Sequence, residues 1–246
     1  MTPPVVLTIA GSDSGGGAGI QADLKTFAAL GAYGASVITA VTAQNTTGVR
    51  AIHPVPAEVV AAQLDAVLED LPVVAVKVGM VADAAVARVI AARARELPHL
   101  VVDPVLVATS GARLGNADLV GALIPYAEVL TPNRAEAEAL TGREAEAAAE
   151  ILAARGARAV VVTGSEMAVD LLRYDGVMEV LAGEPVATAN NHGSGCTFSS
   201  AIAVRLAAGD AVPDAVRAAK KYVTNALRGG SEWRLGAGPG PLNHFA

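Results

Sequence analysis

Two glycine-rich segments of this chain place small residues beside side chains that could carry out chemistry. The second of them, residues 190–197, reads Asn-Asn-His-Gly-Ser-Gly-Cys-Thr and leads into a strongly apolar stretch of helical period. Small residues at the start of a helix leave backbone N–H groups unpaired, and the helix dipole attracts an anion to them. We therefore expect Gly193 and Gly195 to belong to an anion-binding turn.

Cys196, the only cysteine of the chain, falls in the first turn of that expected helix. A helix N-terminus lowers the pKa of a thiol towards the thiolate, which is a base or a nucleophile. The alternative is a small buried apolar residue, because most free cysteines are simply buried. His192 is more typical of a hydrogen-bonded structural histidine than of a catalyst.

The first glycine-rich segment, Gly11–Gly19, reads Gly-Ser-Asp-Ser-Gly-Gly-Gly-Ala-Gly. It lacks the G-x-G-x-x-G dinucleotide fingerprint, and it is not a P-loop because Gly17, rather than lysine, follows Gly16. Its N–H groups at the start of a helix favour an anion or another polar ligand. The alternative is a flexible connection that binds no ligand.

Two acidic residues follow expected strands: Asp103 precedes Pro104, and Glu136 ends the sequence Asn-Arg-Ala-Glu at 133–136. Proteins usually hold Mg²⁺ with one or two carboxylates together with substrate phosphates, so both residues are candidate metal ligands. Glu136 could equally be a first-turn acid that complements the helix dipole. The sequence contains no His/Cys/Asp/Glu group with zinc spacing and no Gly-x-Ser-x-Gly elbow.

Apolar runs of strand length alternate with segments of helical period along most of the chain. The expected buried strands are Val5–Ala10, Ser36–Val41, Val73–Val78, Leu100–Asp103, Glu128–Leu130 and Arg158–Thr163. The expected helices are Gln21–Leu30, Ala57–Leu71, Asp83–Leu97, Asn133–Leu140 and Glu144–Arg155. This alternation predicts an α/β fold with a mostly parallel sheet covered on both faces. Because ligands of such sheets bind beyond the carboxyl ends of the strands, the segments that follow the strands are the candidate site.

The pattern changes in the last third of the chain. The dipeptide Asp175-Gly176 between Leu171–Tyr174 and Val177–Leu181 predicts a two-residue hairpin. Helices are expected over Cys196–Ala208 and Pro213–Arg228, followed by an irregular tail rich in Gly and Pro. No internal repeat or linker divides the chain, so residues 1–246 are expected to form one domain.

Composition narrows the class of protein. The 246 residues include 18 Lys and Arg and 24 Asp and Glu, a net charge of −6, and this acidic balance argues against nucleic-acid binding. A hydrophobic content of 52% argues against disorder. No apolar stretch reaches the ~18–20 residues that span a bilayer, and the N-terminus lacks a signal-peptide pattern. A single cysteine fits a reducing compartment, so a soluble cytoplasmic protein is expected.

Seven motifs taken together resemble one enzyme family. They are Ala10–Asp23, Thr39–Thr46, Lys77–Met80, Asp103–Val105, Thr131–Glu136, His192–Thr197 and Gly240–His244. In this combination and order the chain resembles bacterial hydroxymethylpyrimidine/phosphomethylpyrimidine kinase, a thiamine-biosynthesis enzyme of the ribokinase superfamily. The resemblance covers essentially the whole chain, and it implies a single-domain, ribokinase-like three-layer sandwich.

The resemblance also implies an activity. The family uses ATP and Mg²⁺ to phosphorylate 4-amino-5-hydroxymethyl-2-methylpyrimidine and then its monophosphate. Cys196 falls where many ribokinase relatives carry an aspartate base, and the amides around Gly193–Cys196 would stabilise the transferring phosphoryl group. Gln44 would recognise the aminopyrimidine, because a side-chain amide offers a donor and an acceptor together. The other implied contacts are Asp23, Gly11, Met80 and Val107 for the substrate, Asn133, Thr163, Gly164 and Ser165 for the nucleotide, and Asp103 and Glu136 for the metal.

The chain departs from the family pattern at two places. It has Thr109-Ser110-Gly111 where members usually have Lys-Ser-Gly, and Thr163-Gly164-Ser165-Glu166 where they usually have Lys-Gly-Gly-His. Each departure removes a lysine on the expected nucleotide side, so we expect ATP to bind weakly.

Two other functions remain open at this point. Close relatives of the same fold phosphorylate pyridoxal or pyridoxine, which also carry a hydroxymethyl group on a ring. A non-catalytic pyrimidine-binding protein is the third possibility, although Cys196 and the glycines on both sides of Ser194 argue against it. The family further implies a homodimer that binds small molecules, without a nucleic-acid or membrane partner.

Overall fold

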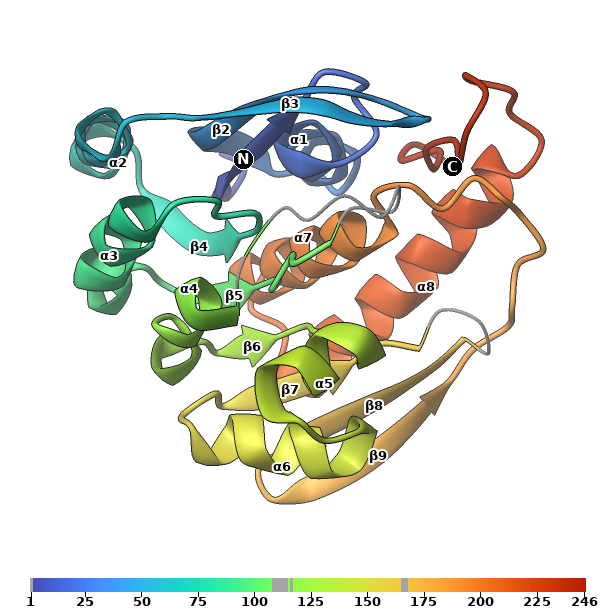
Figure 1. Cartoon of the computed structure of the whole chain (residues 1–246). Helices are drawn as coiled ribbons and strands as arrows, with labels where there is room; N and C mark the ends of the chain where they lie inside the picture. Colours follow the sequence, from blue (N-terminus) through green and yellow to red (C-terminus); the bar gives the residue numbers. More distant parts are fainter. Residues whose placement is uncertain (1, 108–114, 116, 165–167) are drawn as a thin grey trace.

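A computed structural model of the chain describes residues 2–107, 115, 117–164 and 168–246. In these residues one nine-stranded sheet has the order β3-β2-β1-β4-β5-β6-β7-β8-β9, with helices packed on both faces (Figure 1). Neighbouring strands from β2 to β7 pair in parallel, and antiparallel pairs lie at the two edges of the sheet. The predicted α/β class and mostly parallel sheet are confirmed.

From β1 to β7 strands alternate with helices, except that β3 follows β2 directly and α6 follows α5 directly. The strands are β1 Val5–Asp13, β2 Tyr33–Asn45, β3 Gly48–Pro54, β4 Val73–Val78, β5 Leu100–Val102, β6 Val129–Leu130, β7 Ala159–Val162, β8 Val169–Tyr174 and β9 Val177–Ala182. The helices are α1 Gly19–Ala29, α2 Ala57–Asp70, α3 Ala84–Arg93, α4 Ala117–Gly121, α5 Arg134–Thr141, α6 Ala145–Ala154, α7 Ser194–Ala207 and α8 Val212–Gly230. Short 3-10 turns lie at Ala94–Glu96 and Ile124–Tyr126.

An apolar core lies on each face of the sheet, because successive side chains of a strand point to opposite faces. Leu7, Val76 and Val160 face the core that includes residues of α2, α3, α5 and α6. Their neighbours Val6 and Ala75 face the other core, formed with α1, α7 and α8. Burial on both faces explains why the central strands read as continuous apolar runs.

The order of the strands reverses beside β1. The chain leaves β1 for β2 on one side, and after β3 it returns to β4 on the other side of β1. In open α/β sheets the crevice outside the carboxyl ends of the strands, at such a switch point, is where ligands bind. The loops that follow β1, β4, β5, β6 and β7 all begin at this carboxyl edge of the sheet.

Some elements differ from those expected from sequence. β2 is longer than the predicted Ser36–Val41, and β3 was not predicted. All the residues of β3 are exposed or half-buried at the sheet edge, so its sequence lacks the apolar run of a buried strand. The hairpin of β8 and β9 is as predicted, and Asp175 and Gly176 both have positive φ, as a type I′ turn requires.

Among the described residues, no helix is both long enough and apolar enough to cross a membrane.

Candidate active site

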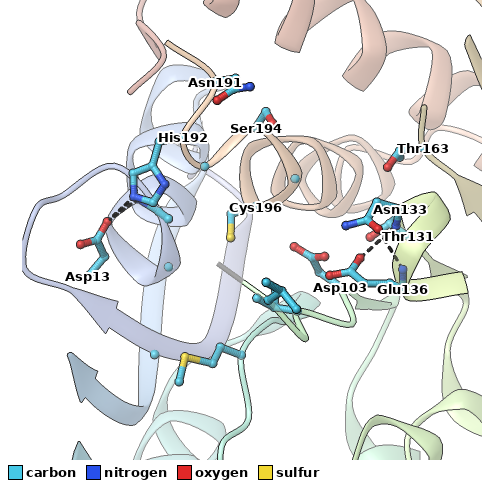
Figure 2. A pocket seen from close by; sticks show the side chains of 18 of the residues that line it. Asp13, Asp103, Thr131, Asn133, Glu136, Thr163, Asn191, His192, Ser194 and Cys196 are labelled. Atoms are coloured by element: carbon cyan, nitrogen blue, oxygen red, sulfur yellow. Dashed lines mark hydrogen bonds and ion pairs between the residues drawn. The ribbon is translucent and has the colours of Figure 1, made fainter. Parts of the chain in front are cut away.

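A cavity of about 680 Å³ opens at the carboxyl edge of the sheet. This volume is within the usual range for small-molecule sites. Figure 2 shows the side chains around it: Asp13 and His192 lie on one side, Asp103, Asn133, Glu136 and Thr163 on the other, and Cys196 between them. The lining includes the predicted Gly11, Gln44, Met80, Val107, Asp103, Asn133, Glu136, Thr163, Gly164, Gly193, Gly195 and Cys196.

The carboxylate of Asp13 organises the glycine-rich loop between β1 and α1. Its oxygens accept hydrogen bonds from the backbone N–H groups of Gly15 (2.8 Å), Gly17 (3.1 Å) and Ala18 (2.9 Å). These N–H groups were expected to bind a ligand, but an internal carboxylate satisfies them. Burial raises the pKa of Asp13, but the hydrogen bonds from His192 and from the loop outweigh burial and lower the pKa overall.

Gln44 reaches the cavity from the end of β2, beside this loop. Its Oε1 accepts a hydrogen bond from the Thr42 hydroxyl (3.1 Å), and its Nε2 lies 3.4 Å from His192 Nε2. His192 Nε2 also lies 2.9 Å from an Asp13 oxygen, and the His192 backbone N–H donates to Gly240 O. His192 is therefore hydrogen-bonded, as the sequence suggested, and it links Asp13 to Gln44.

Gly193 is the N-cap of α7, and it requires glycine for two reasons. Its φ is +87°, in the left-handed region that favours glycine, and a Cβ there would collide with the backbone of Gly17. The close approach brings the glycine-rich loop against the start of α7. Ser194, Gly195 and Cys196 then line the cavity at the positive end of the helix.

Cys196 lies in the first turn of α7, where it is half-buried and lines the cavity between the two groups of side chains (Figure 2). Burial raises the pKa of its thiol to about 12, and the charges of Asp23 and Asp103 add to this rise, while Lys77 opposes it. The expected fall of this pKa is therefore wrong, because loss of solvent and two nearby carboxylates outweigh the Lys77 ammonium.

Asp103 follows β5 and is 5% exposed. It accepts a hydrogen bond from the Ser199 hydroxyl of α7 (3.2 Å). Burial raises the pKa of Asp103 to about 6, although the Lys77 ammonium and hydrogen bonds from Ser199 and Cys196 pull it down. Asp103 thus contacts the same helix that carries Cys196.

Glu136 takes part in a capping box at the start of α5. Asn133 Oδ1 accepts from the Glu136 N–H, and Glu136 Oε2 accepts from the Asn133 N–H, both at 2.9 Å. Its Oε1 accepts from the Leu106 N–H at 3.3 Å. Burial and the charge of Asp103 raise the pKa of Glu136 to about 7. The helix-capping alternative is thus realised, and the same carboxylate still lines the cavity.

Thr163 and Gly164 extend the cavity on the side of β7. Thr163 N–H donates to Pro132 O (2.9 Å), and Thr163 forms an isolated parallel bridge with Asn133. Gly164 N–H donates to a carboxylate oxygen of Asp170 (3.0 Å). The predicted contact Ser165 and the segment around Thr109 lie outside the described residues.

Asp23 does not line the cavity, which corrects the prediction for it. It is fully buried, and both of its oxygens lie 2.9 Å from the Lys77 ammonium. The hydroxyls of Thr8 (2.6 Å) and Ser200 (2.7 Å) also donate to it. Burial lowers the pKa of Lys77, but the adjacent Asp23 carboxylate outweighs this effect and raises the pKa. Asp23 therefore belongs to a buried ion pair and does not contact the cavity.

Sequence reasoning gave no role to Asp13, Lys77 or Arg134. Lys77 carried a signal, because a charge inside an apolar strand must find a buried partner. Asp13 and Arg134 lie inside two of the motifs, but their individual positions in the cavity depend on how distant loops meet.

The parallel sheet with its switch point, the cavity at its carboxyl edge and the glycine turn at the start of α7 define a small-molecule kinase of ribokinase-like fold. The family model described as phosphomethylpyrimidine kinase matches residues 13–243, and the chain belongs to this family.

Individual relatives include members of this family and a kinase of the same fold. The chain is 52% identical to the hydroxymethylpyrimidine/phosphomethylpyrimidine kinase of Rhizobium meliloti (strain 1021), over 98% of this chain and 97% of that one. The crystal structure of phosphomethylpyrimidine kinase from Clostridium difficile 630 matches with a TM-score of 0.80 at 40% identity, over 91% of this chain and 99% of that one. Pyridoxal kinase from Staphylococcus aureus in complex with AMP-PCP and pyridoxal matches with a TM-score of 0.90 at 33% identity, over 100% and 95%.

Proposed function

We propose that this kinase transfers the γ-phosphoryl group of ATP to 4-amino-5-hydroxymethyl-2-methylpyrimidine, and then to its monophosphate, in thiamine diphosphate biosynthesis. The observation that carries the proposal is the division of the cavity by the first turn of α7. Gln44 and Met80 lie on the β2 and β4 side, and Asn133 and Thr163 on the β6 and β7 side. A hydroxymethyl acceptor and a nucleotide bound on opposite sides would meet at Cys196.

The pyrimidine side combines an amide with apolar and backbone surfaces. Gln44 offers a donor and an acceptor to the aminopyrimidine edge. Met80 is 6% exposed and packs with Ala40, while a Cβ on Gly11 would lie 3.0 Å from the Met80 sulfur. Without a side chain on Gly11, the flat ring has room beside the thioether. Val107, which is 48% exposed at the rim, adds an apolar contact.

Phosphoryl transfer passes through a loose transition state, so it relies on positioning and electrostatic stabilisation. The backbone amides of Gly193–Cys196 would stabilise charge on the transferring group. Cys196 would accept the proton of the substrate hydroxyl. Because burial raises the pKa of the thiol to about 12, little thiolate exists at neutral pH, and turnover should rise as the pH increases.

Mg²⁺ fits the donor set on the nucleotide side. Asp103 and Glu136 are both buried and would offer carboxylate oxygens, and the charge of Asp103 raises the pKa of Glu136, a repulsion that a cation would relieve. Among the described residues no cluster of three or more His, Cys, Asp or Glu could hold a metal alone. We propose that the cation would be held by one or two carboxylates and by the phosphates of the substrate. When bound, Mg²⁺ neutralises charge on the phosphoryl group that is transferred.

The S. aureus pyridoxal kinase superposes more closely than the C. difficile enzyme, so pyridoxal is the second candidate acceptor. The higher identity to a hydroxymethylpyrimidine kinase favours the pyrimidine. An ATP-consumption assay with the purified chain should compare hydroxymethylpyrimidine, its monophosphate and pyridoxal. The proposal expects the highest kcat/KM with the pyrimidine and measurable turnover of its monophosphate. A preference for pyridoxal would contradict the proposal. If none of the three compounds supports ATP consumption, all three are rejected as phosphoryl acceptors.

We also propose that residues 1–246 act as one domain, in the cytoplasm and as a homodimer. The continuous sheet supports the single domain, and the one cysteine supports a reducing compartment. The exposed edge strand β3 offers unpaired backbone groups to a second copy. Light scattering coupled to size-exclusion chromatography tests the dimer.

A further inference from the structure

The charges that line the cavity are unequal. Its described lining contains three carboxylates, those of Asp13, Asp103 and Glu136, and Arg134 is the only Lys or Arg among the described lining residues. A nucleoside triphosphate would bring several more negative charges into this acidic cavity. The position of the one cationic side chain is therefore informative.

Arg134 is the first residue of α5, next to the loop that follows β7. The bridge between Asn133 and Thr163 fixes the two segments side by side, as does the hydrogen bond from Thr163 N–H to Pro132 O. A Cβ placed on Gly164 would lie 3.3 Å from Nε of Arg134. The start of the guanidinium thus lies against the backbone of Gly164, on the side of the cavity that carries Asn133 and Glu136.

The side chain of Arg134 is exposed, and it makes no ion pair or hydrogen bond in the part of the chain that the structure describes. Three of the other arginines are paired with acids: Arg93 with Asp65 and Glu96, Arg217 with Glu179 and Asp214, Arg228 with Glu184. A guanidinium presents its donors in a planar fork that matches two oxygens of a phosphate. The guanidinium of Arg134, which has no acidic partner among the described residues, can therefore bind an anion that enters this acidic cavity.

We propose that Arg134 binds the polyphosphate chain of the nucleotide and supplies the cationic side-chain contact to it in this cavity. This inference rests on the proposed function only in taking a nucleotide as the donor. The peptide N–H groups at the start of α7 act on the transferring group near Cys196, whereas Arg134 holds phosphates nearer Gly164. The two contacts divide the phosphate chain between them.

Calorimetric titration of the full chain tests the proposal with ATP, ADP and adenosine as probes. Arg134→Gln should weaken ADP and ATP binding roughly tenfold to hundredfold, the range of a charge-assisted hydrogen bond, and leave adenosine unchanged. Arg134→Lys should restore part of the loss, since it returns the charge without the fork. The matched control is Arg88→Gln, an exposed arginine on α3 outside the cavity, and it should leave all three affinities unchanged.

Three results overturn the proposal. ADP affinity could be the same in Arg134→Gln as in the wild type. Adenosine could weaken as much as ADP, which would mean that Arg134 stacks on the base. ADP and ATP affinity could fall in Arg113→Gln and not in Arg134→Gln; Arg113 belongs to the segment 108–114, which the structure does not describe.

Failure of the proposed function gives a different pattern. A wild type that binds ADP but phosphorylates no pyrimidine rejects that function, and the Arg134 variants still decide the phosphate contact. A wild type that turns over the pyrimidine, together with an Arg134→Gln variant of unchanged ADP affinity and unchanged KM for ATP, rejects Arg134 alone.

Discussion

At the scale of single residues, the burial of Cys196 opposes its proposed role as a general base. A thiol with a pKa raised to about 12 is a poor base in the resting state, yet it lies between the two sides of the cavity. We predict that Cys196→Ala lowers turnover by about 10²–10⁴, the usual worth of a general base, while pyrimidine binding persists. Stopped assays with saturating substrates measure this loss, and near-full turnover would show that Cys196 is not the base.

The pH dependence gives an independent test of the same residue. Thiolate forms as pH rises towards the thiol pKa, so wild-type kcat should increase between about pH 7 and pH 10. Cys196→Ser keeps the size of the side chain but does not ionise in this range. Its kcat should be low and flat with pH, and a parallel rise in both proteins would assign the rise to another group.

Gln44 tests the pyrimidine side. Gln44→Ala removes an amide from a half-buried position that is held by Thr42 and close to His192. An unpaired partner in such a site costs about 1–3 kcal/mol, so pyrimidine affinity should fall by roughly fivefold to a hundredfold. Affinity for ATP should not change. Calorimetric titration with each ligand decides the matter, and equal weakening of both ligands would contradict the assignment of Gln44 to the pyrimidine.

At the scale of elements, the central strands and most helices could be predicted because burial on both faces gives a strong local pattern. β3 could not, since its residues are exposed or half-buried and depend on pairing with β2. Most candidate site residues line one cavity, because most of the family motifs lie near the carboxyl ends of strands or at the start of α7. Asp23 differs because its partner Lys77 is 54 residues away, and sequence alone does not reveal that pair.

The loop after β7 is the element that tests where the nucleotide lies. Thr163 directly follows β7, forms a bridge with Asn133 and lines the cavity. We predict that Thr163→Lys tightens MgATP binding by up to about tenfold, because a charge-assisted phosphate contact is worth roughly 1.5–3 kcal/mol before the cost of ordering the side chain. Pyrimidine affinity should stay the same. Unchanged or weaker MgATP binding would show that this loop does not face the phosphates.

At the scale of the whole molecule, the C-terminal segment ties distant parts of the fold to the site. Asn190 accepts from Gly240 N–H (3.1 Å) and donates to Gly230 O and Trp233 O (both 2.8 Å). The imidazole Nε2 of His244 lies 3.1 Å from the Thr197 hydroxyl of α7. The tail therefore supports the loop that precedes α7.

This tail makes stability depend on pH. Burial, together with the charge of Lys25, lowers the pKa of His244 from 6.5 to about 4. Between these values the unfolded chain binds a proton that the folded chain does not, so the free energy of unfolding falls as pH decreases from 6.5 to 4. The contribution is at most about 1.4 kcal/mol per pH unit. His244→Gln should lose stability less steeply over this window in urea denaturation, and an equal slope would refute the assignment.

The central claim is that one cavity passes the γ-phosphoryl group of ATP to a pyrimidine hydroxymethyl group at Cys196. The most direct measurement follows the label from ATP labelled in its γ-phosphoryl group, incubated with the purified chain, Mg²⁺ and hydroxymethylpyrimidine. The account predicts label in the pyrimidine monophosphate and then in the diphosphate, with the rate reduced by about 10²–10⁴ in Cys196→Ala. Label found only in inorganic phosphate, or transferred equally fast by the variant, would contradict it.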